Sequence, residues 1–363
     1  MNRQADVVVI GAGPAGAMAA LTAARRGWSV IIFEKSRWPR RKTCGAGISP
    51  TARRILRETG LWESVRAAAY PIYGLRLVAP SGRAALLAGA ESAHVLERSR
   101  FDTLLVEAAV AAGARFVPET PVTGLIEEDG IVTGVITPAR EVRGRIVIAA
   151  GGANGTIGRQ RPKILLQTAM AWYEDLPFTP GIMEMFYDPA VLPHYLWLFP
   201  ESDRLVNLGL CLPAERRTQP ITTLFEDLVS RHLGERLAQG RRVRGILGHP
   251  IAVSTQVSFE LTPGVLPVGE AAALVNPATG EGISFAMESG RIATAVVAEA
   301  WKKGRNAAWI GETYRRRAAR AFDRRFATAA FFCRHATCFI ETAAWVGSSR
   351  FMRSLTARAM AKL

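Results

Sequence analysis

The sequence predicts an α/β fold: a doubly wound, parallel cofactor-binding domain interleaved with a mixed β-sheet substrate domain, followed by a helical C-terminal tail. Three observations support this. A β-branched run at residues 7–10 passes through a glycine turn into an alanine-rich helical stretch, 15–26, and a second apolar run follows at 29–33. A glycine-rich strand-to-helix connection recurs at 264–283, and a basic helical pattern fills the chain after residue 306. Alternating strands and helices of this kind form a parallel sheet.

Length and composition agree with an enzyme-sized folded protein. The chain has 363 residues, of which 49% are hydrophobic and 21% charged, so a disordered chain is excluded and two joined domains are possible. The middle of the chain is richer in proline and aromatic residues, which suggests a separate substrate domain. We expect a discontinuous cofactor domain at 1–70, 95–165 and 245–305, a substrate domain at 71–94 and 166–244, and a basic helical segment at 306–363.

Local patterns predict the remaining elements. Helices are expected at 51–69, 98–112, 221–237, 282–301 and from 312 onward. Strands are expected at 75–78, 84–87, 114–117, 122–126, 132–136, 142–150, 182–187, 196–199, 205–212 and 265–268.

The chain is strongly basic. It has 46 Lys and Arg against 31 Asp and Glu, a formal charge of +15 and a pI near 10.5. Arginine-rich stretches at 315–325 and 350–358 alternate with apolar residues, as on amphipathic helices that face solvent or a membrane surface. Because no nucleic-acid reader motif accompanies the charge, we expect no nucleic-acid partner.

The cysteines and the first residues of the chain indicate where in the cell the protein is expected. The four cysteines, Cys44, Cys211, Cys333 and Cys338, form no CxxC pair or metal-binding pattern, so reduced thiols and no metal are expected. The first residues run directly into a strand without a signal peptide, and no apolar stretch reaches the roughly eighteen residues that a membrane span needs. We expect a cytoplasmic protein, or one held peripherally at the inner face of the membrane. The oligomeric state stays open.

The first glycine turn has the spacing of a dinucleotide site. Gly11 permits the tight turn, Gly13 lets the backbone approach a pyrophosphate, and Gly16 lets helix and strand pack closely. Glu34, at the end of the second strand, is placed to bind an adenosine ribose and disfavours the 2′-phosphate of NADPH. The expected cofactor contacts in this segment are Gly11, Gly13, Pro14, Ala15, Gly16, Glu34 and Lys35.

The second glycine-rich segment indicates a flavin. Residues 264–272, followed by 276–283, resemble the second flavin motif of the group 2 FAD oxidoreductases, the superfamily that includes para-hydroxybenzoate hydroxylase. The resemblance implies that an acid, here Glu270, holds the ribityl chain and that the next helix N-terminus faces the flavin ring. Glu270 stands where the superfamily usually has Asp, and Ala273 where it usually has Gly. The expected contacts are Gly269, Glu270, Pro277, Gly280, Gly282 and Ile283.

Two further segments resemble the same superfamily. Residues 98–102 are similar to its RxxFD helix start, whose arginine, here Arg98, lies near the cofactor. Residues 149–159 resemble its GADGxxSxxR segment, but Gly151 replaces the Asp and Gly155 the Ser. The missing acid weakens the case for a hydroxylase reaction with NADPH.

Two segments narrow the family. Residues 42–50 are similar to the KxCGGGIS loop of geranylgeranyl reductases, and residues 195–200 to their YxWxFP motif. Residues 207–210 fit their NVGxG strand. The resemblance spans about residues 5–300, and it implies flavin contacts by Cys44, Gly45 and Ala46.

The candidate catalytic residues are Cys44, Tyr195 and Trp197. The alternation of Tyr195, Trp197 and Phe199 predicts three aromatic rings on one strand face, a wall suited to an apolar chain or a flavin edge, although sheet core packing explains the same pattern. Cys44 could relay a proton or position the substrate, or be a small buried residue. None of the scattered histidines is expected as a base; His194, beside the aromatic motif, is the best of them.

The leading hypothesis is an FAD-dependent enzyme that reduces carbon–carbon double bonds of a prenyl or other lipophilic substrate, with NAD(P)H or ferredoxin as electron donor. The alternative is an FAD-dependent monooxygenase or tailoring enzyme of a small aromatic or polyketide-like substrate. A halogenase is disfavoured, because Tyr195 and Phe199 break the WxWxIP pattern of those enzymes. A third hypothesis, a scaffold with structural FAD, is kept open by the departures at Gly151, Gly155, Glu270 and Ala273.

Overall fold

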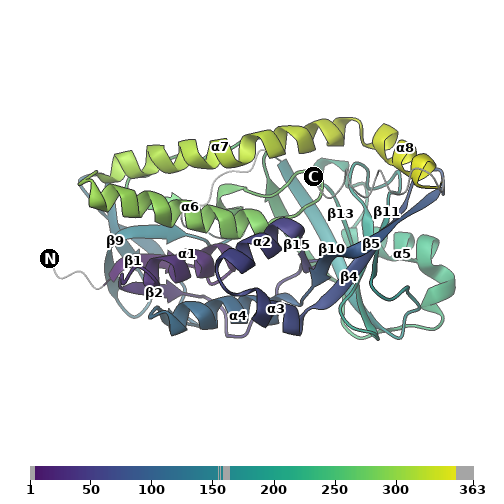
Figure 1. Ribbon diagram of the computed structural model, residues 1–363, viewed down its shortest axis with the longest axis horizontal. Coiled ribbons are helices and arrows are strands. Elements are labelled where there is room, and N and C mark those ends of the chain that lie inside the picture. The colour runs from purple at the N-terminus through teal and green to yellow at the C-terminus, as the bar shows by residue number, and fades with distance from the viewer. Residues whose placement is uncertain (1–4, 154, 156, 158–163, 349–363) are drawn as a thin grey trace.

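The computed structural model describes residues 5–153, 155, 157 and 164–348. Two β-sheets lie side by side along its length, and helix α7 (Ala307–Arg334) runs across the top of both (Figure 1). The α/β architecture with two sheets and a helical tail confirms the predicted fold class. Residues 349–363, which carry the basic 350–358 stretch, lie outside the described residues.

The first sheet contains the predicted βαβ unit. In the described part of the chain it has seven strands in the order β6-β2-β1-β9-β8-β7, with β16 beside β9. Its parallel strands are β1 (Ala5–Ile10), β2 (Val30–Phe33), β6 (Arg115–Val117), β9 (Glu141–Ala149) and β16 (Val265–Pro267). The antiparallel strands β7 (Gly124–Glu128) and β8 (Ile131–Ile136) complete it.

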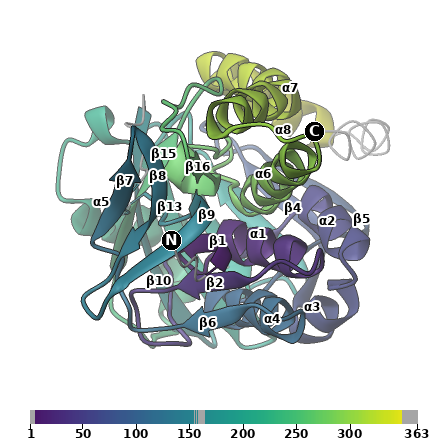
Figure 2. The same ribbon diagram turned by 90° about the vertical axis from the view of Figure 1, so that its left-hand side faces the viewer.

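Both faces of this sheet are covered, which explains the nearly continuous apolar runs of its strands. Val7 and Val9 pack toward the helices, whereas Val8 and Ile10 pack toward the β7–β8 hairpin. The helices packed on the first face include α1 (Pro14–Ala24), α4 (Arg98–Ala111), α6 (Ile283–Lys302) and α7. Figure 2 shows α6 between α1 and α7.

The second sheet carries the aromatic wall. Among the described residues it has nine strands in the order β14-β10-β13-β12-β11-β4-β5-β3, with β15 beside β10. They are β3 (Gly47–Ile48), β4 (Tyr70–Val78), β5 (Ala84–Val95), β10 (Ile164–Glu174), β11 (Ile182–Phe186), β12 (Leu196–Pro200), β13 (Leu205–Pro213), β14 (Arg241–Arg242) and β15 (Leu247–Val253). Helix α5 (Ile221–Leu237) covers one face of this sheet. Helix α8 (Ala336–Ser348) packs on the other face, in the hydrophobic cluster that contains Tyr195 and Trp197.

Several element boundaries differ from the expected ones. The single helix expected at 51–69 is two helices, α2 (Pro50–Glu58) and α3 (Trp62–Ala68), because Gly60 between them takes a φ of +71° that no helix continues. Strands β10 and β15 were not expected. Helix α7 starts earlier than residue 312, because the Asn306 side chain caps it by accepting from Trp309 N at 2.9 Å.

The two sheets are joined by segments that cross between them. Strands β3 and β15 come from stretches assigned to the cofactor domain, yet they pair with β5 and β10 of the second sheet. The domain boundaries therefore stay a prediction. Within the described residues, no helix is both long and apolar enough to cross a membrane.

Alanine substitutions at two helical glycines, Gly290 and Gly234, should change the stability in opposite directions. A methyl group at Gly290 of α6 would come 2.5 Å from the carbonyl oxygen of Ala15 in α1, whereas nothing lies within 4 Å of the same position at Gly234 of α5. Gly290→Ala should lower the free energy of unfolding by about 2 kcal/mol through overpacking. Gly234→Ala should raise it by roughly 0.5–1 kcal/mol, because alanine favours the helix. Urea unfolding followed by circular dichroism measures both, and equal effects would contradict the close α1–α6 packing.

Candidate active site

A cavity of about 1050 Å³ lies where the two sheets meet. Its walls come from the β1–α1 turn, the loop between β2 and β3, the segment around η2 (Gly269–Ala272) and the start of α6, and the face of β12. The expected site residues that line it are Gly11, Gly13, Pro14, Ala15, Glu34, Lys35, Cys44, Gly45, Ala46, Arg98, Tyr195, Trp197, Glu270, Gly280, Gly282 and Ile283. Gly16, Gly269 and Pro277 are not part of its lining.

The glycine turn brings the backbone close to its neighbours. Gly11 has a φ of +97°, and a side chain there would meet the Ala150 carbonyl oxygen at 2.5 Å. A side chain at Gly16 would overlap the Gly11 carbonyl oxygen. At Gly13, where α1 begins, a methyl group would lie 3.4 Å from Nη2 of Arg40 and 3.9 Å from Nη2 of Arg98. Two guanidinium groups and a helix N-terminus therefore converge on one point, an arrangement that favours a diphosphate.

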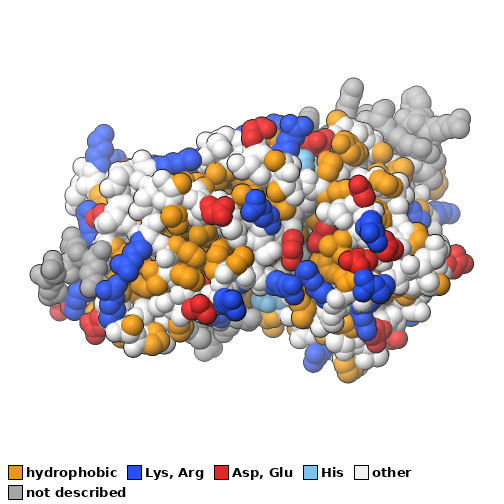
Figure 3. Space-filling view, turned by 90° about the horizontal axis from the view of Figure 1, so that it is seen from below, with side chains coloured by type: hydrophobic (Ala, Val, Ile, Leu, Met, Phe, Trp, Pro, Cys, Tyr) orange, Lys and Arg blue, Asp and Glu red, His pale blue; other side chains and the backbone are white. Residues whose placement is uncertain are grey.

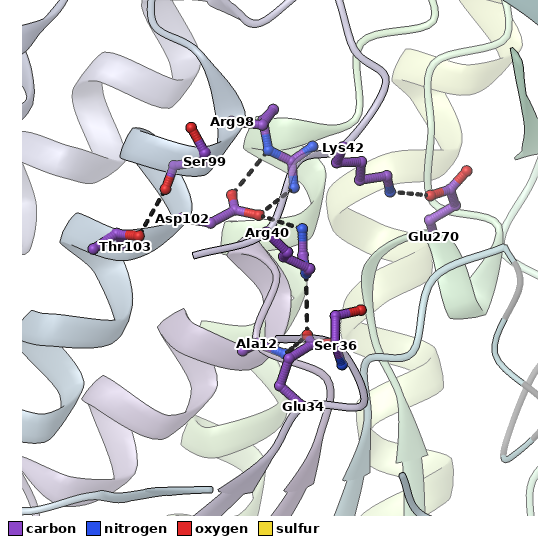
Figure 4. Close-up of polar contacts among 10 residues, drawn as sticks. All are labelled: Ala12, Glu34, Ser36, Arg40, Lys42, Arg98, Ser99, Asp102, Thr103 and Glu270. Atoms are coloured by element: carbon purple, nitrogen blue, oxygen red, sulfur yellow. Dashed lines mark hydrogen bonds and ion pairs between the residues drawn. The ribbon is translucent and has the colours of Figure 1, made fainter. Parts of the chain in front are cut away.

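A buried carboxylate, Asp102, holds both guanidinium groups (Figure 4). Arg98 donates from Nε to Oδ1 at 2.9 Å and from Nη2 to Oδ2 at 2.8 Å, and Nη1 of Arg40 lies 3.1 Å from Oδ2. Burial disfavours the Arg98 charge, but Asp102 and the side chain of Cys44 raise the pKa of Arg98 above its usual value. Sequence reasoning missed Arg40 and the part played by Asp102, since only the resemblance pointed to this helix start.

Glu34 lies at the other end of the same network, joined to it by Arg40. Its Oε2 accepts from Ala12 N and from Nε of Arg40, both at 3.1 Å, and its Oε1 accepts from Ser36 N at 3.1 Å. The acid is therefore fixed at the carboxyl end of β2, beside the glycine turn. This is the place at which a carboxylate in such a fold reaches a ribose.

Lys42 and Glu270 form an ion pair across the cavity, with Nζ 2.8 Å from Oε2 (Figure 4). Burial opposes the ionisation of Glu270, but the Lys42 ammonium group holds the pKa of this carboxyl below its usual value. The carboxylate lies over the 151–152 turn: a methyl group at Gly152 would be 3.6 Å from its Oε2. Glu270, although longer than the Asp of the family motif, thus remains ionised and lines the cavity near the glycine turn.

The substitutions in the motifs have visible structural consequences. Side chains at Gly151 and Gly155 would each approach the other residue's Cα, at 3.2 and 3.1 Å, so the paired glycines form one compact turn. Ala46 and Ala273 take left-handed φ values of 60° and 54°, where the family motifs have glycine. The backbone geometry of a glycine is therefore kept at both alanines, at some cost in strain.

The aromatic residues form a continuous wall of the cavity. Centroid distances are 6.3 Å between Tyr195 and Trp197 and 6.1 Å between Trp197 and Phe199, and all three rings line the cavity. The Tyr195 hydroxyl donates to the Thr279 carbonyl oxygen at 2.6 Å, and burial raises its pKa well above the usual value. The phenol is therefore neutral and held by the main chain of the second flavin segment, which suits it to positioning.

Cys44 lies between the charged end and the aromatic wall. Its N–H donates to Sδ of Met170 at 3.1 Å, and its Sγ accepts from Ala46 N at 3.3 Å. The thiol is half-buried, lines the cavity and is close enough to Arg98 to raise that residue's pKa. The position is compatible with proton relay or substrate contact.

Two histidines differ in their relation to the cavity. His194 is buried outside it, with Nε2 2.9 Å from the Pro277 carbonyl oxygen. His249 of β15 lines the cavity and was missed, because β15 itself was not expected. Burial lowers the pKa of both to about 4, and at His249 the Lys42 charge adds to this effect. Both imidazoles are therefore neutral at pH 7.

Comparison with known proteins gives a consistent picture. The FAD binding domain family matches residues 4–327. A digeranylgeranylglycerophospholipid reductase of Methanocella arvoryzae is 32% identical over 327 residues, covering 84% of this chain and 80% of the relative. A menaquinone reductase of Mycolicibacterium smegmatis is 28% identical over 348 residues, covering 85% and 80%.

Solved structures show the same fold. A geranylgeranyl bacteriochlorophyll reductase-like protein of Thermoplasma acidophilum superposes with a TM-score of 0.87 at 25% identity, covering 98% of this chain and 95% of that one. A flavin-dependent brominase has a TM-score of 0.82 at 21% identity, covering 98% and 93%. The brominase likeness shows the fold alone.

The lowered pKa values of His194 and His249 predict a pH dependence of stability. In the unfolded chain both titrate near pH 6.5, so between pH 6.5 and about 4 the unfolded state binds more protons than the folded state. Stability therefore falls as the pH drops through this window, by up to about 1.4 kcal/mol per pH unit for each histidine. Urea unfolding of the FAD-free protein measures this slope. His194→Asn and His249→Asn should each flatten it, whereas the exposed His335→Asn serves as the control; unchanged slopes would contradict the buried neutral rings.

Proposed function

The chain belongs to the FAD binding domain family and, within it, to the geranylgeranyl reductases, and from this we propose that it reduces carbon–carbon double bonds of a prenyl or other lipophilic substrate. It is an FAD-dependent oxidoreductase. The single observation that carries the substrate proposal is the cavity itself, which is charged around Gly13 and apolar along β12.

The residues at the charged end fit FAD. The open face of Gly13, flanked by Arg40 and Arg98, suits the diphosphate, and Glu34 lies where the adenosine ribose would bind. We assign Glu270 to the ribityl chain on the basis of the family resemblance and its ionised state. FAD, when bound, supplies the hydride chemistry, while the protein orients the substrate and excludes competing reactions.

The apolar end suits a flexible hydrocarbon chain. Beyond the three aromatic rings, the cavity is lined by Met183, Met185, Cys211 and Ile251. Methionine side chains adapt to irregular apolar shapes, and burial of a chain among them is favourable in proportion to the area removed from water. Cys44, at the junction of the two ends, or a water molecule beside it, would supply the proton.

The alternative functions have less support. A monooxygenase or halogenase reaction rests on fold likeness only, as for the brominase at 21% identity. The WxWxIP tryptophans of halogenases are absent from β12, where Tyr195 and Phe199 stand. A scaffold with structural FAD would have no need for an apolar chamber beside the cofactor residues.

An anaerobic assay tests the reduction. Chemically reduced, FAD-loaded enzyme given geranylgeranyl substrates should form products heavier by two hydrogens, detected by mass spectrometry. Trp197→Ala should lower kcat/KM by roughly 30- to 150-fold, because about 2–3 kcal/mol of aromatic packing against the substrate is lost. Trp309→Ala, a half-buried tryptophan of α7 outside the cavity lining, is the matched control. Formation of oxygenated products only, and only in air, would favour the monooxygenase.

The electron donor is a separate question. We propose NAD(P)H or a ferredoxin, because the one glycine turn of the GxGxxG type noted in the sequence is assigned to FAD. Parallel anaerobic reduction of the yellow protein by NADPH, NADH and reduced ferredoxin, followed by its absorbance, identifies the donor class.

We also propose that the protein binds a membrane surface through α7 and α8. The outer side of α7 exposes Arg315, Arg316, Arg320 and Arg324, and three aromatic residues are exposed farther along α7 and α8: Phe331, Phe339 and Trp345, at 49%, 43% and 64% exposure. Basic residues beside exposed aromatic rings are typical of interfacial helices. On the opposite face, seen in Figure 3, acidic and basic side chains are interspersed.

Two of the three exposed rings, Phe339 and Trp345, lie on a helix whose buried face packs in the hydrophobic cluster of the aromatic wall. The inner face of α8, Ala336, Ile340 and Ala344, is buried in the same hydrophobic cluster as Tyr195 and Trp197. A lipophilic substrate could therefore pass from the bilayer into the cavity along α8 without crossing water.

Vesicle sedimentation tests the membrane contact. The protein should bind phosphatidylglycerol vesicles more tightly than phosphatidylcholine vesicles, and the triple variant Phe331→Ser, Phe339→Ser, Trp345→Ser should bind at least about tenfold more weakly, because apolar contact area is lost. Replacing the four exposed arginines by glutamine should remove most of the salt dependence. Val110→Ser with Ile131→Ser, two exposed apolar residues on α4 and β8, is the control and should leave binding unchanged.

A further inference from the structure

A line of buried hydrogen bonds runs behind the aromatic wall. Nε1 of Trp197 donates to Oδ1 of Asn207 at 2.7 Å, and Nδ2 of Asn207 donates to Oε1 of Glu201 at 2.9 Å. The same Glu201 oxygen accepts from Nε1 of Trp172 at 3.0 Å. Asn207 has no exposed surface. One carboxylate thus fixes an amide, and the amide fixes the indole that faces the cavity.

The same amide reaches the Cys44 loop. Nδ2 of Asn207 also points to the Gly45 carbonyl oxygen, at 3.4 Å. The loop lies flat on the wall at this point: a methyl group at Gly45 would be 3.1 Å from the Phe199 ring and 3.4 Å from Nε1 of Trp197. On the other side of the indole, a side chain at Gly209 would overlap the Trp197 ring. Trp197 is therefore held between two glycines, and Asn207 ties it to the loop.

The network depends on the acceptor oxygen Oε1 of Glu201. Burial raises the pKa of this carboxyl, and nearby Glu97 acts in the same direction, while hydrogen bonds from Trp172 and Asn207 and the charge of Arg244 oppose the shift. Arg244 stacks on Trp172, 4.9 Å from its ring centroid, and pairs with Glu97 at 3.2 Å. Each buried N–H donor has an acceptor, so the removal of one member leaves others unpaired, which is costly in a low-dielectric setting.

We propose that Glu201 and Asn207 are positioning residues that set the plane of Trp197 and hold the Cys44 loop at a fixed distance from it. The substrate chamber would then keep its width because wall and loop are tied to one amide. The inference rests on the proposed function for its consequence in catalysis. The hydrogen bonds of Asn207 to Trp197 and to the Gly45 carbonyl oxygen are contacts within the chain and can be tested without substrate.

Replacing the Asn207 amide by a carboxylate tests whether Asn207 holds the Cys44 loop. Asn207→Asp keeps the acceptor for Trp197 but loses both amide donors and places a second carboxylate beside Glu201. In FAD-loaded protein, the labelling rate of Cys44 by a maleimide should rise about tenfold and kcat should fall. Glu201→Gln alone keeps the acceptor oxygen and should stay within about twofold of wild type. The double variant Asn207→Asp, Glu201→Gln removes the repulsion between two carboxylates but does not restore the donor to the Gly45 carbonyl oxygen, so Cys44 labelling should stay close to that of Asn207→Asp.

Peptide mass spectrometry resolves the labelled sites, so the exposed Cys338 of α8 is an internal standard for reagent and protein concentration. Tyr314→Phe, which removes a buried hydrogen bond of α7 to the Pro267 carbonyl oxygen, controls for general loss of stability. The proposal is overturned if Asn207→Asp leaves Cys44 labelling at the wild-type rate, if the double variant returns to the wild-type rate, or if Tyr314→Phe raises labelling equally. Because labelling needs no substrate, a failed reductase assay would leave this result interpretable.

Discussion

The cofactor end of the cavity depends on one buried carboxylate. Asp102 has no exposed surface, and it binds Arg98 through two hydrogen bonds while also lying within ion-pair distance of Arg40. Two guanidinium groups this close to each other and to a helix N-terminus would repel without it. With it, both can point at Gly13, where the backbone leaves room for a diphosphate. The positive charge at Gly13 is thus held in place by the chain's own carboxylate.

From this carboxylate, two lines of contact run through the site. Arg40 leads to Glu34 and the adenosine end, and Arg98 leads to Cys44 and the loop that lies on Trp197. The loop that carries Cys44 therefore contacts both Arg98 at the charged end of the cavity and the rings of Trp197 and Phe199 on the second sheet.

The sequence allowed prediction of those parts whose signals are local. The glycine turn, Glu34 and the first βαβ unit lie within about thirty residues, as such units do, and each follows from strand and turn chemistry. What it did not predict depends on partners far apart in the chain: Lys42 meets Glu270 across 228 residues, and His249 enters the cavity only because β15 pairs with β10. Strand β10 was missed because its largely apolar run is 11 residues long, a length at which the pattern fits a helix as well as a strand. The Glu201 network was invisible for the same reason, since nothing in the sequence shows that Trp172 and Trp197 share an acceptor.

The departures from the family motifs count less against a redox role than they do in sequence. The glycine at 151 accounts for the glycine at 155 and the reverse, because a side chain at either position would come close to the backbone of the other. Glu270 is longer than the usual Asp, yet Lys42 holds it ionised and directed to the same end of the cavity. Ala273 keeps the left-handed backbone that glycine would take, at a local cost in strain. Strain of this kind persists only where the surrounding structure enforces the geometry, so the turn after Glu270 is held for what it positions.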